Sequence, residues 1–145
     1  MPSNRQEILD YARKVYNRGH HCSEAVAITI GDYYMGKTPE IIVRASCPFG
    51  GGVGGCRQEL CGVVGGGTLI LGALMGRLSS DEDDDDLYEM VCRFRDGFIE
   101  AYGTTQCEPV RDSMPEMDKR CLPVVVKGVE ILLDLLDETE LVPVK

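Results

Sequence analysis

The feature that most constrains the fold is an apolar run at residues 60–76, which contains six glycines and no charged side chain. A glycine inside a helix costs on the order of 1 kcal/mol relative to alanine, so six of them forgo roughly 6 kcal/mol of helix preference. Close packing can offset this loss, because a helix face without side chains lets another backbone or a bound group approach. We therefore expect residues 61–76 to form a central buried helix, with the Cys61 thiol at its amino-terminal end.

Length and charge exclude several classes of protein. A chain of 145 residues is long enough to bury about 70% of its unfolded surface, so we expect a single domain over residues 1–145. The formal net charge is −9, much of the excess acid lies at residues 81–86, and the 15 Lys and Arg residues are dispersed. Nucleic acids and anionic membranes both require a basic face, so neither is an expected partner.

The amino terminus, the length of the apolar run and the cysteine content of the chain bear on its cellular compartment. The amino-terminal residues lack the basic patch, apolar stretch and cleavage site of a secretory signal, so we expect a cytoplasmic protein. The run at residues 60–76 is shorter than the roughly 20 residues that cross a bilayer, so we expect no membrane span. In a reducing compartment, seven cysteines favour metal binding or redox chemistry over structural disulfides.

Helical periodicity and capping residues predict an all-α fold of five or six helices, without convincing strand alternation. Asn4 suits an N-cap, and Gly36 and Gly103 suit helix ends. Residues 47–56 hold five glycines and predict a loop, and residues 104–119 are expected to be irregular. The first three expected helices span residues 5–18, 22–35 (or 23–35) and 39–46, the last of these with Thr38 as its cap. The fourth starts between residues 56 and 61 and ends at residue 77. The fifth spans residues 84–102, and the sixth starts at residue 120 or 123 and ends at residue 137.

Three cysteines lie at predicted helix starts, Cys22, Cys61 and Cys121, whereas Cys107 lies in the predicted loop after the fifth helix. Unpaired N–H groups and the helix dipole favour a negative sulfur at such positions. A thiolate is both the reactive nucleophile and the ligand for soft metals and iron–sulfur clusters. The sequence has no CxxC spacing, so it lacks the signatures of thioredoxin-type chemistry and of zinc ribbons.

The order of these cysteines resembles a known family. Cys22-Ser-Glu-Ala-Val is followed by the glycine-rich stretch, Cys61-Gly-Val-Val-Gly, Cys107 and Cys121, which is similar to the C_GCAxxG_C_C family of redox-active proteins. Val63 stands where the family motif has alanine. The resemblance implies a redox role for the four motif cysteines, and a related domain of split-Soret cytochromes accompanies an iron–sulfur cluster. The remaining cysteines, Cys47, Cys56 and Cys92, fall outside the motif.

The leading hypothesis is that Cys22, Cys61, Cys107 and Cys121 converge on an iron–sulfur cluster in a small electron carrier or oxidoreductase. One alternative is a dithiol carrier, with Cys61 as the attacking thiolate and Cys22 or Cys56 as the resolving partner. Another alternative is a metal-stabilised helical interaction module without redox turnover. The sequence names no redox partner protein, and self-association into a homo-oligomer stays open.

Three other signals favour structural interpretations. His20 and His21 precede Cys22, but adjacent histidines are more typical of a solvated turn than of metal ligands. The glycines at 50, 52 and 55 match GxGxxG without the preceding strand that dinucleotide binding needs. The acidic run at residues 81–86 lacks the glycine and glutamate that complete a calcium loop, so it predicts a solvated helix start.

Overall fold

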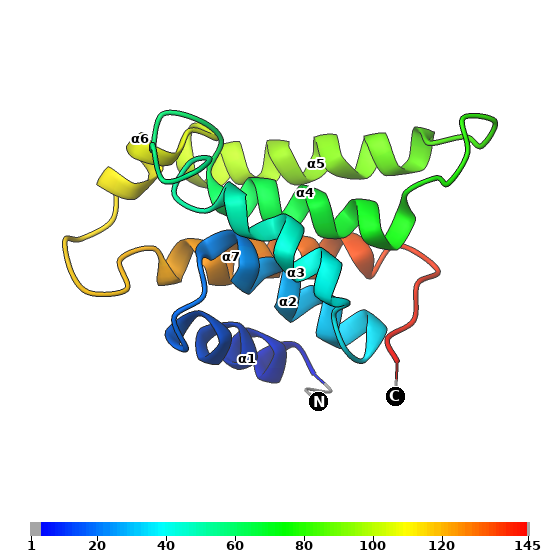
Figure 1. The fold of residues 1–145 in the computed structure, drawn as a ribbon, viewed down its shortest axis with the longest axis horizontal. Coiled ribbons are helices and arrows are strands. Elements are labelled where there is room, and N and C mark those ends of the chain that lie inside the picture. The colour runs from blue at the N-terminus through cyan, green and yellow to red at the C-terminus, as the bar shows by residue number, and fades with distance from the viewer. Residues whose placement is uncertain (1–3, 145) are drawn as a thin grey trace.

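Seven α-helices and a one-turn 3₁₀-helix form within residues 4–144, the part of the chain that the computed structural model describes, and no strand forms there (Figure 1). The all-α prediction is therefore confirmed, although the expected number of helices was too small. In chain order the helices are α1 (Arg5–Asn17), α2 (Cys22–Met35), α3 (Glu40–Ser46), η1 (Cys47–Phe49), α4 (Gly62–Met75), α5 (Asp85–Tyr102), α6 (Cys107–Asp112) and α7 (Leu122–Leu136).

Capping residues fix three helix ends as predicted. The side chain of Asn4 accepts a hydrogen bond from the Glu7 N–H at 2.9 Å and caps α1. Gly36 and Gly103 follow α2 and α5 with φ of 84° and 80°, a conformation that glycine adopts without strain. These short-range signals depend only on neighbouring residues, which is why the sequence predicts them correctly.

Two local predictions were wrong, and one helix start differs from its expected range by one residue. The segment at residues 104–119 is not wholly irregular, because α6 forms within it; Pro109 lies in the first turn, where a missing N–H breaks no helical bond. The glycine-rich helix begins at Gly62 and leaves Cys61 as its N-cap. Thr38 does not cap α3, since Pro39 occupies that position and the Thr38 hydroxyl donates to Ile28 O at 3.1 Å.

The glycine-rich helix α4 packs against α2, α3, α5 and α7. In Figure 1, α4 lies beside α5, with α2 and α3 on its other side and α1 farther out. One hydrophobic core joins α1, α2, α4, α5 and α7, and each fully buried large side chain in it contributes about 1.5–3 kcal/mol. Its largest fully buried members include Phe94, Phe98, Ile30, Ile70, Leu71, Leu132 and Leu136.

Close approach accounts for several glycines of α4. A Cβ on Gly66 would overlap the backbone of Ser23 in α2, and a Cβ on Gly67 would lie 2.5 Å from the ring of Phe94 in α5. Gly72, in contrast, has no neighbour within 4 Å of that position. Packing therefore explains the glycines in the amino-terminal half of α4, where α2 comes closest, and does not explain Gly72.

Val63, the residue that departs from the motif, is fully buried. A Cβ on Gly128 of α7 would overlap the Val63 side chain. Gly128 therefore provides the space that the larger side chain at position 63 requires.

Within the described chain, none of the helices combines the length and apolarity needed to cross a bilayer.

Candidate thiol site

The four motif cysteines line one cavity of about 310 Å³. Each lies at the start of a different helix: Cys22 and Cys107 are the first residues of α2 and α6, and Cys61 and Cys121 are the N-caps of α4 and α7. The amino-terminal ends of these helices gather at the end of the molecule shown on the left in Figure 1. The formation of α6 thus adds a fourth helix start to the three that the sequence predicts.

A short antiparallel contact joins the segments that carry Cys61 and Cys107. Leu60 and Gln106 form an isolated bridge. The Cys61 N–H donates to Thr105 O at 2.7 Å, and the Cys107 N–H donates to Glu59 O at 2.9 Å. These bonds position two thiols that are far apart in sequence, and one bridged pair is too short to produce strand alternation.

The glycine-rich loop forms another wall of the cavity. All five residues at positions 51–55 have positive φ, and Val53, at 67°, is the member that is not glycine. Such a run is accessible mainly to glycine, because a Cβ makes this backbone conformation costly. The loop brings Gly51 to the cavity, and a Cβ on Gly52 would lie 2.5 Å from the Cβ of Cys107. The loop composition is therefore required both by its conformation and by the closeness of the thiols.

Basic side chains face this cavity in a protein that is acidic overall. Arg57, Arg111 and Lys119 line it together with His20 and His21, and none of the described lining residues is acidic. A cavity with cationic walls favours an anionic occupant, and the summed field of such groups acts at short range.

Burial controls the ionisation of the thiols. It raises the pKa of Cys22, Cys107 and Cys121, and it raises the pKa of Cys61 to about 12, with the nearby Cys22 contributing. The backbone N–H groups of Gly51 and Gly62 act in the opposite direction on the pKa of Cys22 but do not outweigh burial. The N–H groups at the helix starts thus favour the thiolate, as expected, but burial has the larger effect and leaves the pKa of these thiols raised.

The spacing of the thiols bears on what the cavity can hold. Two groups of described residues have three ligand atoms within 4.8 Å of one another, and neither group contains a motif cysteine. Four sulfurs around a single tetrahedral zinc ion would lie about 3.8 Å apart, given a zinc–sulfur bond of about 2.3 Å. The arrangement is thus more open than a single metal ion requires.

An iron–sulfur cluster fits these residues. Four thiols line one cavity, and glycine makes room for one of them, since a Cβ on Gly62 would overlap the sulfur of Cys22. Cys22, Cys61, Cys107 and Cys121 would hold the cluster, which is anionic when four thiolates ligate it and would face Arg57 and Arg111.

The other three cysteines lie outside the lining of the cavity. Cys47, Cys56 and Cys92 are exposed, and all seven cysteines are free. The Cys56 thiol donates to Gly52 O at 3.1 Å. Cys22 is therefore better placed than Cys56 to act with Cys61.

Comparison with known proteins places the chain in a family. The model of the family described as "Putative redox-active protein (C_GCAxxG_C_C)" matches residues 20–135, which is well over half of the chain and includes all four motif cysteines. No curated protein and no solved structure matches the chain. The chain belongs to the C_GCAxxG_C_C family.

Proposed function

We propose that this protein is a small electron carrier in which Cys22, Cys61, Cys107 and Cys121 bind an iron–sulfur cluster. A redox role follows from the family. The observation that carries the proposal further is that four thiols from four separate helix starts line one cavity. A reducing cytoplasm, in which such thiols stay reduced, is the compartment that suits this role.

The spacing of the thiols supports a cluster over a single ion. No three of the motif sulfurs lie within 4.8 Å of one another, whereas the ligand atoms of a mononuclear tetrahedral zinc site lie about 3.8 Å apart. A cluster places several iron and sulfide atoms between its ligands, so it suits a larger cavity with thiols at its walls. A Cβ on Gly62 or Gly52 would collide with Cys22 or Cys107, so these two glycines allow the two cysteines to take their positions beside the cavity.

When bound, the cluster would supply a centre that accepts and releases electrons. The protein's own residues would set its environment. The backbone N–H groups of Gly51 and Gly62 face the Cys22 sulfur, and those of Val63 and Val64 face the Cys61 sulfur. Donors to ligand sulfur and nearby cations such as Arg57 and Arg111 stabilise added negative charge, and both therefore raise the reduction potential.

A dithiol carrier is the alternative with a specific observation in its favour. Cys22 and Cys61 line the same cavity and interact strongly enough that Cys22 raises the pKa of Cys61. Burial raises the pKa of Cys61 to about 12, which keeps this thiol protonated at pH 7 and is unfavourable for an attacking thiolate. Metal binding, in contrast, deprotonates a coordinating thiol outright.

A metal-stabilised module without redox turnover is the remaining alternative. It differs from the electron carrier in one measurable respect, since the bound metal would hold the four helix starts together and take up no electron. Removal of metal by a chelator would then unfold the protein, and a reductant would leave its spectrum unchanged.

Anaerobic reconstitution with iron and sulfide tests the proposal. The expected product is coloured, contains iron and sulfide in comparable amounts, and bleaches reversibly on reduction. The Cys61→Ser variant should lose this colour, whereas Cys92→Ser should retain it, because Cys92 is exposed on α5 and outside the cavity. A wild-type protein that stays colourless and iron-free would contradict the proposal.

A further inference from the structure

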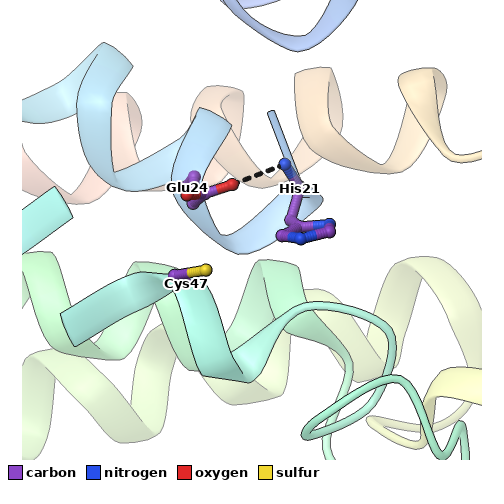
Figure 2. A group of neighbouring side chains, drawn as sticks. All are labelled: His21, Glu24 and Cys47. Atoms are coloured by element: carbon purple, nitrogen blue, oxygen red, sulfur yellow. Dashed lines mark hydrogen bonds between the residues drawn. The ribbon is translucent and has the colours of Figure 1, made fainter. Parts of the chain in front are cut away.

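A second group of metal-ligating side chains lies on the outer side of the amino-terminal end of α2. The ligand atoms of His21, Glu24 and Cys47 all lie within 4.8 Å of one another. Figure 2 shows the Cys47 sulfur turned toward the space between Glu24 and His21, across the gap between η1 and the start of α2. Glu24 and Cys47 do not line the thiol cavity, whereas His21 lines it as well.

The fold holds these three residues in place. The His21 N–H donates to Glu24 Oε1 at 2.8 Å, which fixes the glutamate at the first turn of α2. Cys47 is the first residue of η1, and η1 immediately precedes the glycine-rich loop. A Cβ on Gly50 would lie 2.8 Å from the His21 side chain, so the end of η1 packs directly on that residue. The grouping therefore results from the packing of two chain segments and not from one helix end alone.

We propose that His21, Glu24 and Cys47 form a binding site for a single divalent cation of the zinc type. An imidazole nitrogen, a carboxylate oxygen and a thiolate sulfur are all ligands that zinc accepts. A hard cation such as magnesium or calcium prefers oxygen ligands alone, so the donor set selects against it.

The charges of the three side chains and the spacing of their ligand atoms suit a divalent cation of the zinc type. A neutral imidazole, a carboxylate and a thiolate together balance the charge of a divalent cation. Zinc–ligand bonds of about 2.0–2.3 Å place tetrahedral ligand atoms about 3.5 Å apart. Since the three ligand atoms lie within 4.8 Å of one another, they need to close by at most about 1.3 Å. His21 and Cys47 are exposed, which allows this adjustment and leaves a fourth coordination position open to water.

A cation bound by His21, Glu24 and Cys47 would also affect the neighbouring thiol cavity. The cation would tie the start of α2 to η1, and η1 leads into the loop whose Gly51 N–H faces the Cys22 sulfur. Nothing in the assignment requires a cluster at the motif cysteines, so the two proposals can fail separately.

Zinc binding to the reduced, cluster-free protein tests the site. Protein prepared without air is equilibrated with micromolar free zinc from a buffered chelator, and the zinc bound per chain is counted for the wild type, Cys47→Ser and Cys92→Ser. The Cys47→Ser variant should bind one zinc fewer than the wild type, and Cys92→Ser should bind as many. Any zinc at the motif thiols contributes equally to all three proteins and cancels in the comparison.

Two further variants distinguish the loss of a zinc ligand from misfolding of the protein. His21→Ala and Glu24→Gln each remove or weaken one ligand, and the amide of the glutamine can still accept from the His21 N–H. Each should lower the apparent zinc affinity of this site by at least about tenfold while the helical circular dichroism stays unchanged. Equal zinc content in the wild type and Cys47→Ser, or an equal loss in Cys92→Ser, would overturn the proposal.

Discussion

Gly62, the first residue of α4, lies so close to the Cys22 sulfur that a Cβ at position 62 would overlap it. A Cβ on Gly62 would also lie 3.0 Å from Phe49 O, so position 62 is confined on two sides. This contact joins the glycine-rich helix, the start of α2 and the loop region that together shape the thiol cavity.

The Gly62→Ala variant should therefore impair both folding and cluster binding. Forcing a methyl group against a thiol and a carbonyl typically destabilises a protein by about 1–3 kcal/mol. Urea unfolding and iron content after reconstitution measure the two effects. The matched control is Gly72→Ala in the same helix, where no packed neighbour lies within 4 Å of the added Cβ and the substitution should stabilise by up to about 1 kcal/mol. Equal stability and iron content in the two variants would contradict the assigned role of Gly62.

The Val63 and Gly128 contact predicts non-additive mutational effects. Gly128→Ala alone should destabilise by about 1–3 kcal/mol, because the new methyl group overlaps the Val63 side chain. Val63→Ala alone should destabilise by about 2 kcal/mol through the buried volume that it removes. The double variant should be less destabilised than the sum of the two, as chemical denaturation would measure. Strict additivity would mean that the two residues do not share this space.

The raised pKa of Cys61 predicts how the stability of the metal-free protein depends on pH. Burial raises this pKa from its ordinary value of 9.0 to about 12. The unfolded chain therefore loses its proton first, so the free energy of unfolding should fall as the pH rises from 9 towards 12.

The control for this effect is Cys61→Ala, since other thiols and tyrosines also titrate at high pH. Between about pH 8 and about pH 11, anaerobic unfolding measurements should give a steeper fall for the wild type than for the variant. Parallel curves would show that Cys61 is not protonated in a buried environment.

Arg111 should influence the reduction potential of a bound cluster. Burial raises the pKa of Cys107 and Cys121, and the cationic side chain of Arg111, which faces the cavity, acts against this rise by stabilising negative charge there. Arg111→Ala should shift the midpoint potential to a more negative value, as a dye-mediated anaerobic titration would measure. Arg95→Ala is the control, because Arg95 is an exposed residue of α5 outside the cavity. A potential that both variants leave unchanged would argue against this role.

Structural features that depend only on residues close together in the sequence could be predicted from the sequence. Asn4 and Gly103 mark helix ends through capping and positive φ, and the apolar periodicity gives the all-α class. The helix positions of Cys22, Cys61 and Cys121 follow from the same signals. What these signals could not supply is the convergence of the helix starts, which results from packing between distant segments.

The missed features all depend on long-range contacts. The helix at Cys107 is short and contains a proline, and its start is fixed by pairing with Glu59 across the chain. The raised pKa of Cys61 results from tertiary burial that a helix position does not reveal. Glu24 had no sequence signal as a ligand, because Cys47 reaches it only through the packing of η1 on α2.

The most direct test of the account is a crystal structure of the anaerobically reconstituted protein, with iron located by its anomalous scattering. The account predicts iron inside the cavity, within bonding distance of the sulfurs of Cys22, Cys61, Cys107 and Cys121. Iron bound elsewhere, or a cavity in which these sulfurs are joined as disulfides under reducing conditions, would contradict it.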